Sequence, residues 1–208
     1  MFDFNPMMII AGLPGLIIAM VIHEYAHAQV AVWLGDFTPR LMGRLTLNPK
    51  AHIDPIGMLM LFLVHFGWAK PVQINPRNFK NPQRDDILVS LAGPMANFVT
   101  AFLALVVLVV FDRMGGDMTA GVYMVFRLII EYNIGFGIFN LIPLPPLDGS
   151  HVLMQLLPRD MAYKLAGLER YSFLILIVLL MTPVLSMILI PCRNLIWQIF
   201  RLLLSPFI

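Results

Sequence analysis

The sequence predicts an all-α polytopic membrane protein with about four full spans, one short or re-entrant segment, and short β-strands in the cytoplasmic-side loops. Composition is the first reason: 59% of the 208 residues are hydrophobic and 12% are charged, against about 25% charged in soluble domains. The mean hydropathy of +0.82 agrees. Several apolar runs also approach or exceed the roughly 20 residues that cross a bilayer. Too few charged residues remain to cover a soluble protein of this length, so that class is excluded.

Apolar runs place the expected helices in order along the chain. The first is predicted at about residues 7–34, and with no positively charged segment before it we expect a retained helix and not a signal peptide. The run at 56–68 is too short for a comfortable span and is typical of re-entrant or interfacial segments. Long helices are predicted at about 87–111 and 121–142. A last span is predicted at 173–190, with a proline that would kink it.

The remaining segments are expected to lie outside the spans. Residues 44–47 and 72–74 alternate apolar and polar side chains within proline-rich loops, which predicts two short strands. Residues 150–171 and 196–208 are predicted to form interfacial helices. No repeat or separate soluble domain is recognised, so residues 1–208 are predicted to form one membrane-embedded domain.

The distribution of lysine and arginine predicts the orientation. Ten of these residues concentrate in three loops. They are Arg40, Arg44 and Lys50; Lys70, Arg77, Lys80 and Arg84; and Arg159, Lys164 and Arg170. The positive-inside rule places all three loops in the cytoplasm, provided that residues 56–68 do not cross fully. This predicts a multi-pass protein of the cell membrane. No basic run indicates nucleic-acid binding.

The segment His23-Glu24-Tyr25-Ala26-His27 points to metal chemistry. Its histidines are four apart on a predicted helix, so both imidazoles project from one face at a spacing that suits one metal ion. The glutamate can reach a water on that ion and take its proton during attack on a peptide carbonyl. Ionisable groups in an apolar helix cost on the order of 2–3 kcal/mol each, which favours a functional role.

A third metal ligand must come from elsewhere, and the residues alone leave several candidates. These are Asp148, His151, His52, His65, Glu131 and Asp54. The orientation places Asp148 at the depth of the two histidines, in a turn expected to be rigid because prolines and Gly149 flank it. An aspartate there could equally be an ordinary turn or capping residue.

Several ordered motifs resemble one known family. They are HEYAH at 23–27, GPMAN at 93–97, NLIPLPPLDG at 140–149, and the loop segments GRLTLNPKAHIDPIG at 43–57 and GWAKPVQINP at 67–76. Together they cover roughly residues 10–150 and resemble the short bacterial members of the site-2 protease family of intramembrane metalloproteases. No PDZ-like insertion and no nucleotide-sensing CBS domain is recognised.

The resemblance implies an intramembrane zinc endopeptidase that cuts peptide bonds in or near transmembrane segments of membrane-protein substrates. It implies one zinc ion per chain, held by His23, His27 and Asp148. It makes Glu24 the catalytic base, with the active site toward the cytoplasm. Asn97 and Asn140 match positions that lie near the active site in the family and help to hold substrate backbone or the developing oxyanion.

Two other functions compete with an enzyme that cuts transmembrane helices. A membrane protease that cuts in a lumenal chamber usually takes a glutamate as third ligand, which here means Glu131 or Glu169. A metal transporter or regulatory pseudoprotease would not need Glu24 as a base. For the leading hypothesis, strand addition to residues 44–47 and 72–74 could hold an unwound substrate.

Overall fold

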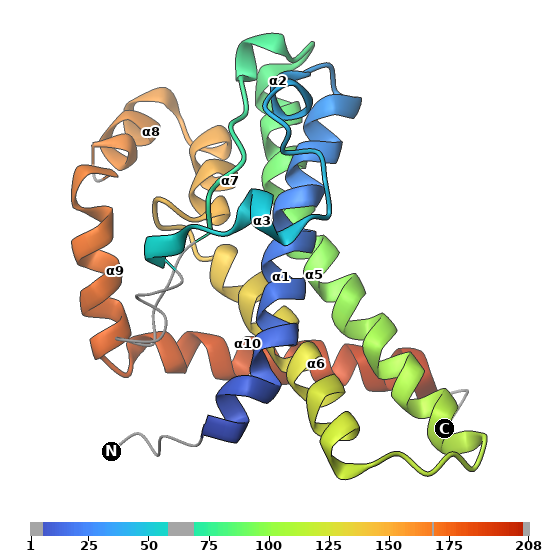
Figure 1. Ribbon diagram of the computed structural model, residues 1–208. Coiled ribbons are helices and arrows are strands. Elements are labelled where there is room, and N and C mark those ends of the chain that lie inside the picture. The colour runs from blue at the N-terminus through green and yellow to red at the C-terminus, as the bar shows by residue number, and fades with distance from the viewer. Residues whose placement is uncertain (1–5, 58–68, 168, 206–208) are drawn as a thin grey trace.

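The computed structural model describes residues 6–57, 69–167 and 169–205 (Figure 1). The short or re-entrant segment predicted at 56–68 lies outside these residues, apart from its first two positions. Within the described chain, four helices are long and apolar enough to cross a membrane. The chain is therefore a multi-pass membrane protein.

Three long helices form the central bundle. They are α1 (Pro6–Trp33), α5 (Pro82–Arg113) and α6 (Ala120–Asn140), and they pack against one another (Figure 1). Each lies where an apolar run predicts a helix, and α5 begins one turn earlier than expected. Asn81 precedes Pro82, and a proline at the first helical position fits there because its missing N–H has no intrahelical partner anyway.

The outer surface of the bundle is apolar. On α5, the side chains of Val99, Leu103, Val107 and Val110 are each about half exposed, at spacings that place them along one face. Ala101 and Ala104 turn inward and are buried against α6. An apolar face turned outward is unfavourable in water but suits lipid, where contact with hydrocarbon costs nothing.

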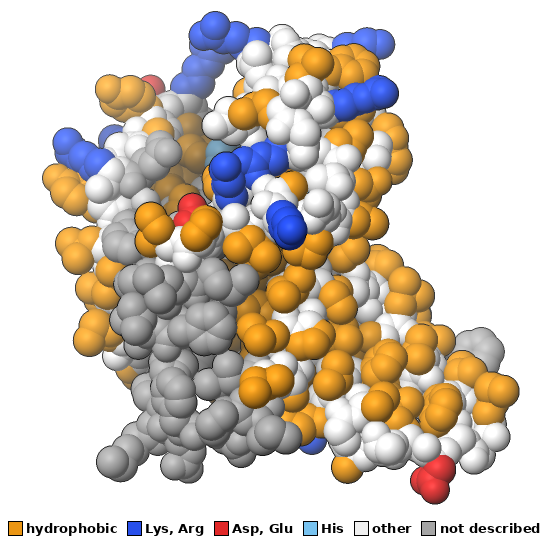
Figure 2. Space-filling model, in the orientation of Figure 1, with side chains coloured by type: hydrophobic (Ala, Val, Ile, Leu, Met, Phe, Trp, Pro, Cys, Tyr) orange, Lys and Arg blue, Asp and Glu red, His pale blue; other side chains and the backbone are white. Residues whose placement is uncertain are grey.

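Lysine and arginine side chains are unevenly distributed over the visible face (Figure 2). Lysine and arginine gather over the upper part of the view, near the loops between α1 and α5, while the lower part is mostly hydrophobic (Figure 2). The exposed cations here are Arg40, Lys50, Lys70, Arg77 and Lys80 of these loops and Arg84 in the first turn of α5. Such an asymmetry is typical of a membrane protein with one strongly basic side.

The C-terminal third differs from its prediction. After α7 (Asp148–Leu156), α8 (Arg159–Ala166) and the short η2 (Glu169–Tyr171), the chain forms α9 (Ser172–Met181) and α10 (Val184–Leu204). A single kinked span at 173–190 is therefore wrong. The helix ends before Pro183, and α9 is about 15 Å long at 1.5 Å per residue, half of a hydrocarbon core.

Helix α10 runs across the bundle instead of along it (Figure 1). Phe200 is buried against the α5–α6 core, and Arg193 lies 3.9 Å from the carboxylate of Glu131 on α6. These contacts attach α10 to α6, although most of its apolar side chains remain exposed.

The described parts of the loops contain short helices and no ladder of strands. Helices α2 (Thr38–Leu41), α3 (Pro49–His52) and η1 (Pro76–Asn78) interrupt them, and one isolated antiparallel bridge joins Ile53 to Ala69. The strands predicted in the cytoplasmic-side loops are therefore wrong within the described residues.

The physical reason is that a strand needs a partner backbone to bond to. In the segment predicted as the second strand, the N–H of Val72 donates to the Glu24 carboxylate, and that of nearby Asn75 donates to the Asp36 carboxylate. Side chains of α1 and of the turn after it thus take the bonds that a neighbouring strand would have made.

Asp36 joins the end of α1 to the loop over the bundle. Its side chain is fully buried and accepts hydrogen bonds from Thr38, from the backbone N–H of Asn75 at 2.7 Å and from the Asn78 amide at 2.7 Å. Burial alone would raise the pKa of this carboxyl, but these hydrogen bonds outweigh it and hold the pKa below its ordinary value.

We expect Asp36→Asn to lower the free energy of unfolding by about 1–3 kcal/mol, because an amide cannot accept all of these bonds. The ionised Asp36 carboxylate stabilises the fold at pH values above the ordinary pKa of aspartate. This stabilisation is lost as the pH falls through the lowered pKa that Asp36 has in the folded protein. The difference in the free energy of unfolding between the wild-type and Asp36→Asn proteins should therefore shrink below about pH 4. Thermal unfolding in detergent across pH measures it. The exposed Asp117→Asn is the control, and an equal effect there would contradict the assignment.

Candidate metal centre

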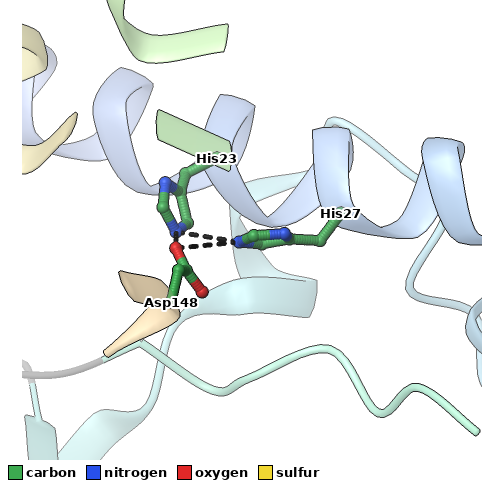
Figure 3. Close-up of side chains that lie close together, drawn as sticks. All are labelled: His23, His27 and Asp148. Atoms are coloured by element: carbon green, nitrogen blue, oxygen red, sulfur yellow. Dashed lines mark hydrogen bonds and ion pairs between the residues drawn. The ribbon is translucent and has the colours of Figure 1, made fainter. Parts of the chain in front are cut away.

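Three side chains from distant parts of the sequence converge at one point (Figure 3). The Nε2 atoms of His23 and His27 lie 3.0 Å apart. An oxygen of Asp148 lies 3.1 Å from the first and 3.4 Å from the second. Both histidines are buried, and the aspartate side chain is 19% exposed. The geometry therefore unites the two predicted histidines with one of the six candidates for a third ligand.

Hydrogen bonds on the far side of each imidazole fix its protonation. His23 Nδ1 lies 2.8 Å from the amide oxygen of Asn97, and His27 Nδ1 lies 2.7 Å from the carbonyl oxygen of Val89. Both oxygens only accept, so each Nδ1 carries a proton and donates it. In a neutral imidazole the Nε2 atom is then an unprotonated acceptor.

The orientation of the Asn97 amide is fixed independently. Its nitrogen donates to the carbonyl oxygen of Ala19 at 2.8 Å and to the amide oxygen of Asn133 at 3.0 Å. The oxygen must then face His23, which removes the usual ambiguity between the two ends of an amide. Sequence reasoning missed Asn133, and its place in an apolar helix is the signal that could have revealed it.

With both imidazoles neutral, three acceptor atoms face one another. The Asp148 oxygen is buried and accepts no hydrogen bond of proper geometry within the described part of the chain. Lone pairs at such distances repel unless a cation lies among them. Two imidazole nitrogens and a carboxylate oxygen form a donor set that zinc accepts readily. The residues thus fit a zinc ion.

Close packing of α5 against α1 makes this arrangement possible. A Cβ atom added to Gly93 would lie 2.6 Å from Cε1 of His23 and would also overlap His27. Only glycine leaves room for both rings beneath α5. The glycine of the GPMAN motif therefore has a steric explanation that does not require contact with substrate.

Asp148 reaches the histidines through the turn after α6. Residues 141–147 are irregular, and Asp148 is the first residue of α7, not part of the non-helical turn that the prolines suggest. A Cβ added to Gly149 would lie 2.7 Å from the carbonyl oxygen of Ile142 and would also overlap Leu141. The glycine lets α7 begin directly against the end of α6, which brings the carboxylate under α1.

Glu24 lies beside this group in the same cavity. The cavity has a volume of about 520 Å³, and the three ligand candidates, Glu24 and Asn140 all line it. One Glu24 oxygen accepts a hydrogen bond from the Val72 N–H at 2.9 Å. A carboxylate thus borders the metal group without belonging to it.

The two predicted asparagines have different surroundings. Asn97 is fully buried, and its amide groups are occupied by protein partners. Asn140 lines the cavity, and its nitrogen donates to the carbonyl oxygen of Phe136 at 2.9 Å. Only the second is placed to meet a molecule in the cavity, and its role there stays a prediction.

Comparison with known proteins identifies the family. The model of the family described as "Peptidase family M50" matches residues 113–183. A Bacillus subtilis protein with the provisional name zinc metalloprotease YwhC is 41% identical over 86% of this chain and 84% of its own length. The chain belongs to the M50 peptidase family.

Further relatives agree with this M50 assignment. Rip2 of Mycobacterium tuberculosis, also provisionally named a zinc metalloprotease, is 31% identical over 84% of this chain and 68% of its own length. Rip2 of Mycolicibacterium smegmatis is similar to the same degree. No solved structure matches significantly. The resemblance to the site-2 protease family is confirmed, and the M50 chain is a zinc metalloprotease.

The other candidate ligands within the described residues of this M50 peptidase do not join the group. His151 lines the cavity without approaching the three atoms. His52 bonds to the carbonyl of Thr46, and Asp54 caps the turn that follows it. Glu131 pairs with Arg193. His65 and the side chain of Glu169 lie outside the described residues.

We expect Gly93→Ala to reduce zinc binding by the M50 peptidase at least tenfold, because the added methyl group displaces both imidazoles. Zinc content after dialysis against a weak chelator measures the effect. Gly135→Ala on α6 is the matched control, because a Cβ there meets no atom within 4 Å. Equal zinc content in the two variants would contradict the steric role.

Proposed function

We propose that this M50 zinc metalloprotease is an intramembrane endopeptidase that hydrolyses peptide bonds in or near the transmembrane segments of membrane proteins. The observation that carries the proposal is the position of the metal group. The two histidines of the group lie on a helix that is long and apolar enough to span a membrane. The group borders a cavity that the Glu24 carboxylate also lines.

In this proposal His23, His27 and Asp148 hold the zinc ion. Their three donor atoms converge, and the buried oxygen of Asp148 lacks any other partner among the described residues. Zinc, when bound, supplies Lewis-acid activation of water and of a peptide carbonyl. Asn97 and Val89 hold the two imidazoles by their Nδ1 atoms, which keeps Nε2 free to coordinate.

Glu24 is the general base of the proposal. It follows His23 directly and borders the cavity, so its carboxylate can take a proton from the attacking water and return it to the leaving amine. The bond from Val72 engages one carboxylate oxygen, Oε2, and holds the side chain toward the cavity.

The depth of the site supports a substrate within the membrane. The candidate span runs from Ile10 to Trp33. At 1.5 Å per residue, His23 lies roughly 15 Å from one end and roughly 20 Å from the other. The metal group is thus enclosed in the span. The chain between α1 and α5 borders the cavity and carries the exposed cations Arg40, Lys50, Lys70, Arg77 and Lys80, so we place this side in the cytoplasm and the protein in the cell membrane.

We expect Glu24→Gln to retain one zinc per chain while its cleavage rate falls by about 10²–10⁴, the usual contribution of a general base. The assay uses transmembrane peptides in lipid nanodiscs and follows fragments by mass spectrometry. Asp148→Ala is the comparison, because it should lose both zinc and cleavage. Full cleavage by the Glu24→Gln protein would overturn the base assignment, and zinc retained in Asp148→Ala would overturn the ligand assignment.

Asn97→Ala distinguishes two roles for a buried amide. If Asn97 orients His23, the variant should bind zinc about 10–100-fold more weakly, and cleavage should recover as zinc is added. Competition with a chromogenic chelator gives the affinity. A variant with unchanged zinc affinity and a low rate at saturating zinc would instead support the oxyanion role.

A further inference from the structure

The cavity at the metal centre extends past the groups that the proposed function uses. Asp86, Ser90 and Gln155 also line it. Asp86 lies in the second turn of α5 and Gln155 near the end of α7, so the two helices that meet the metal group continue together beyond it.

Asp86 is a buried carboxylate that has no cationic partner among the described residues. Its side chain belongs to a residue that is 8% exposed, and its Oδ2 atom accepts a hydrogen bond from the amide of Gln155 at 2.8 Å. The ion pairs found in the described part of the chain involve other carboxylates. A buried charge is costly unless it is paired. Asp86 therefore presents to the cavity a carboxylate whose hydrogen-bond partner is a neutral amide.

Its distance from the metal group follows from helix geometry. Gly93 contacts the ligand imidazoles, and Asp86 precedes it by two turns on the same face of α5. Seven residues rise about 10 Å, and an extended peptide covers that length in about three residues. A substrate held at the metal group could thus place a side chain against Asp86.

We propose that Asp86 and Gln155 form a subsite for a lysine or arginine side chain of the substrate. The subsite lies toward the N-terminal end of α5, about three residues from the cleaved bond. This proposal rests on the proposed function. Membrane proteins carry lysine and arginine where their spans meet the cytoplasm. A cation held at Asp86 would therefore fix the cleavage position relative to that border.

The neighbouring aspartate shows that the charge of Asp86 is not needed to begin the helix. Asp85 is 4% exposed, and its carboxylate accepts the backbone N–H of Asn81 at 3.0 Å, so it already serves the first turn of α5. Asp85 does not line the cavity.

A purely structural role for Asp86 is the main alternative, because its bond to Gln155 joins α5 to α7. Asparagine at position 86 keeps an acceptor oxygen for this bond and removes only the charge. Asp86→Asn therefore distinguishes a structural role of Asp86 from a role in binding a substrate cation. Asp85→Asn is the matched control.

The test measures binding to the Glu24→Gln protein in lipid nanodiscs, which needs no cleavage. Three transmembrane peptides are compared that differ only in carrying lysine, glutamine or glutamate at the cytoplasmic border. We expect the lysine peptide to bind at least about tenfold more tightly than the glutamine peptide, as for other hydrogen bonds to charged groups. In the Asp86→Asn variant, the ratio of the affinities for the lysine and glutamine peptides should fall near one. The zinc content and the affinity for the glutamine peptide should stay unchanged. Asp85→Asn should leave the ratio unaltered.

Charge reversal gives a second readout. Asp86→Lys should make the glutamate peptide the preferred one. A lysine preference that survives Asp86→Asn, or no lysine preference in the starting protein, would overturn the subsite. Cleavage of the same peptides by the zinc-loaded wild-type protein is followed in parallel. Absence of cleavage with an intact binding preference would refute the proposed function and not the subsite.

Discussion

The close packing of α1 against α5 is the constraint on which the metal centre depends. Two histidines on one helix face can adopt many rotamers, and only the second helix restricts them. Val89 and Asn97 of α5 accept the Nδ1 protons, while Gly93 between them leaves room for both rings. The direction of each imidazole lone pair is thus decided by a neighbouring helix, as is usual for metal-ligating histidines.

Carboxylates organise the polar part of this membrane protein, and each has a separate use. Asp148 lies against the two histidines, Glu24 borders this group, and Asp36 holds η1 and the residue before it to the end of α1. Glu131 joins α10 to α6 through Arg193. Charges cost much in an apolar environment unless they are paired or bonded. Asp86 also lines the cavity, where its hydrogen-bond partner is the neutral amide of Gln155 and where neither the metal group nor the proposed base uses it, which is why we assign it to substrate.

Family membership and local geometry support different parts of the functional conclusion. The matched family model covers residues 113–183, which include Asp148 but not the helix with the histidines. The relatives cover most of the chain and carry the name zinc metalloprotease. Contacts within this chain support the assignment of the metal ligands, the base and the cation subsite. Each assignment has its own measurement: zinc content for the ligands, cleavage rate for the base and peptide binding for the subsite.

The sequence by itself determined the membrane class, the three bundle helices, and His23, Glu24 and His27 as a unit, because composition, apolar length and helical spacing are local properties. Only the tertiary structure showed which candidate third ligand among the described residues lies against the histidines, because Asp148 is more than a hundred residues from them. It also placed Asn97 behind His23 and, in the segment predicted as the second strand, gave the backbone N–H groups carboxylate partners. Those outcomes depend on which backbone and side-chain groups meet across helices, and no local pattern encodes that.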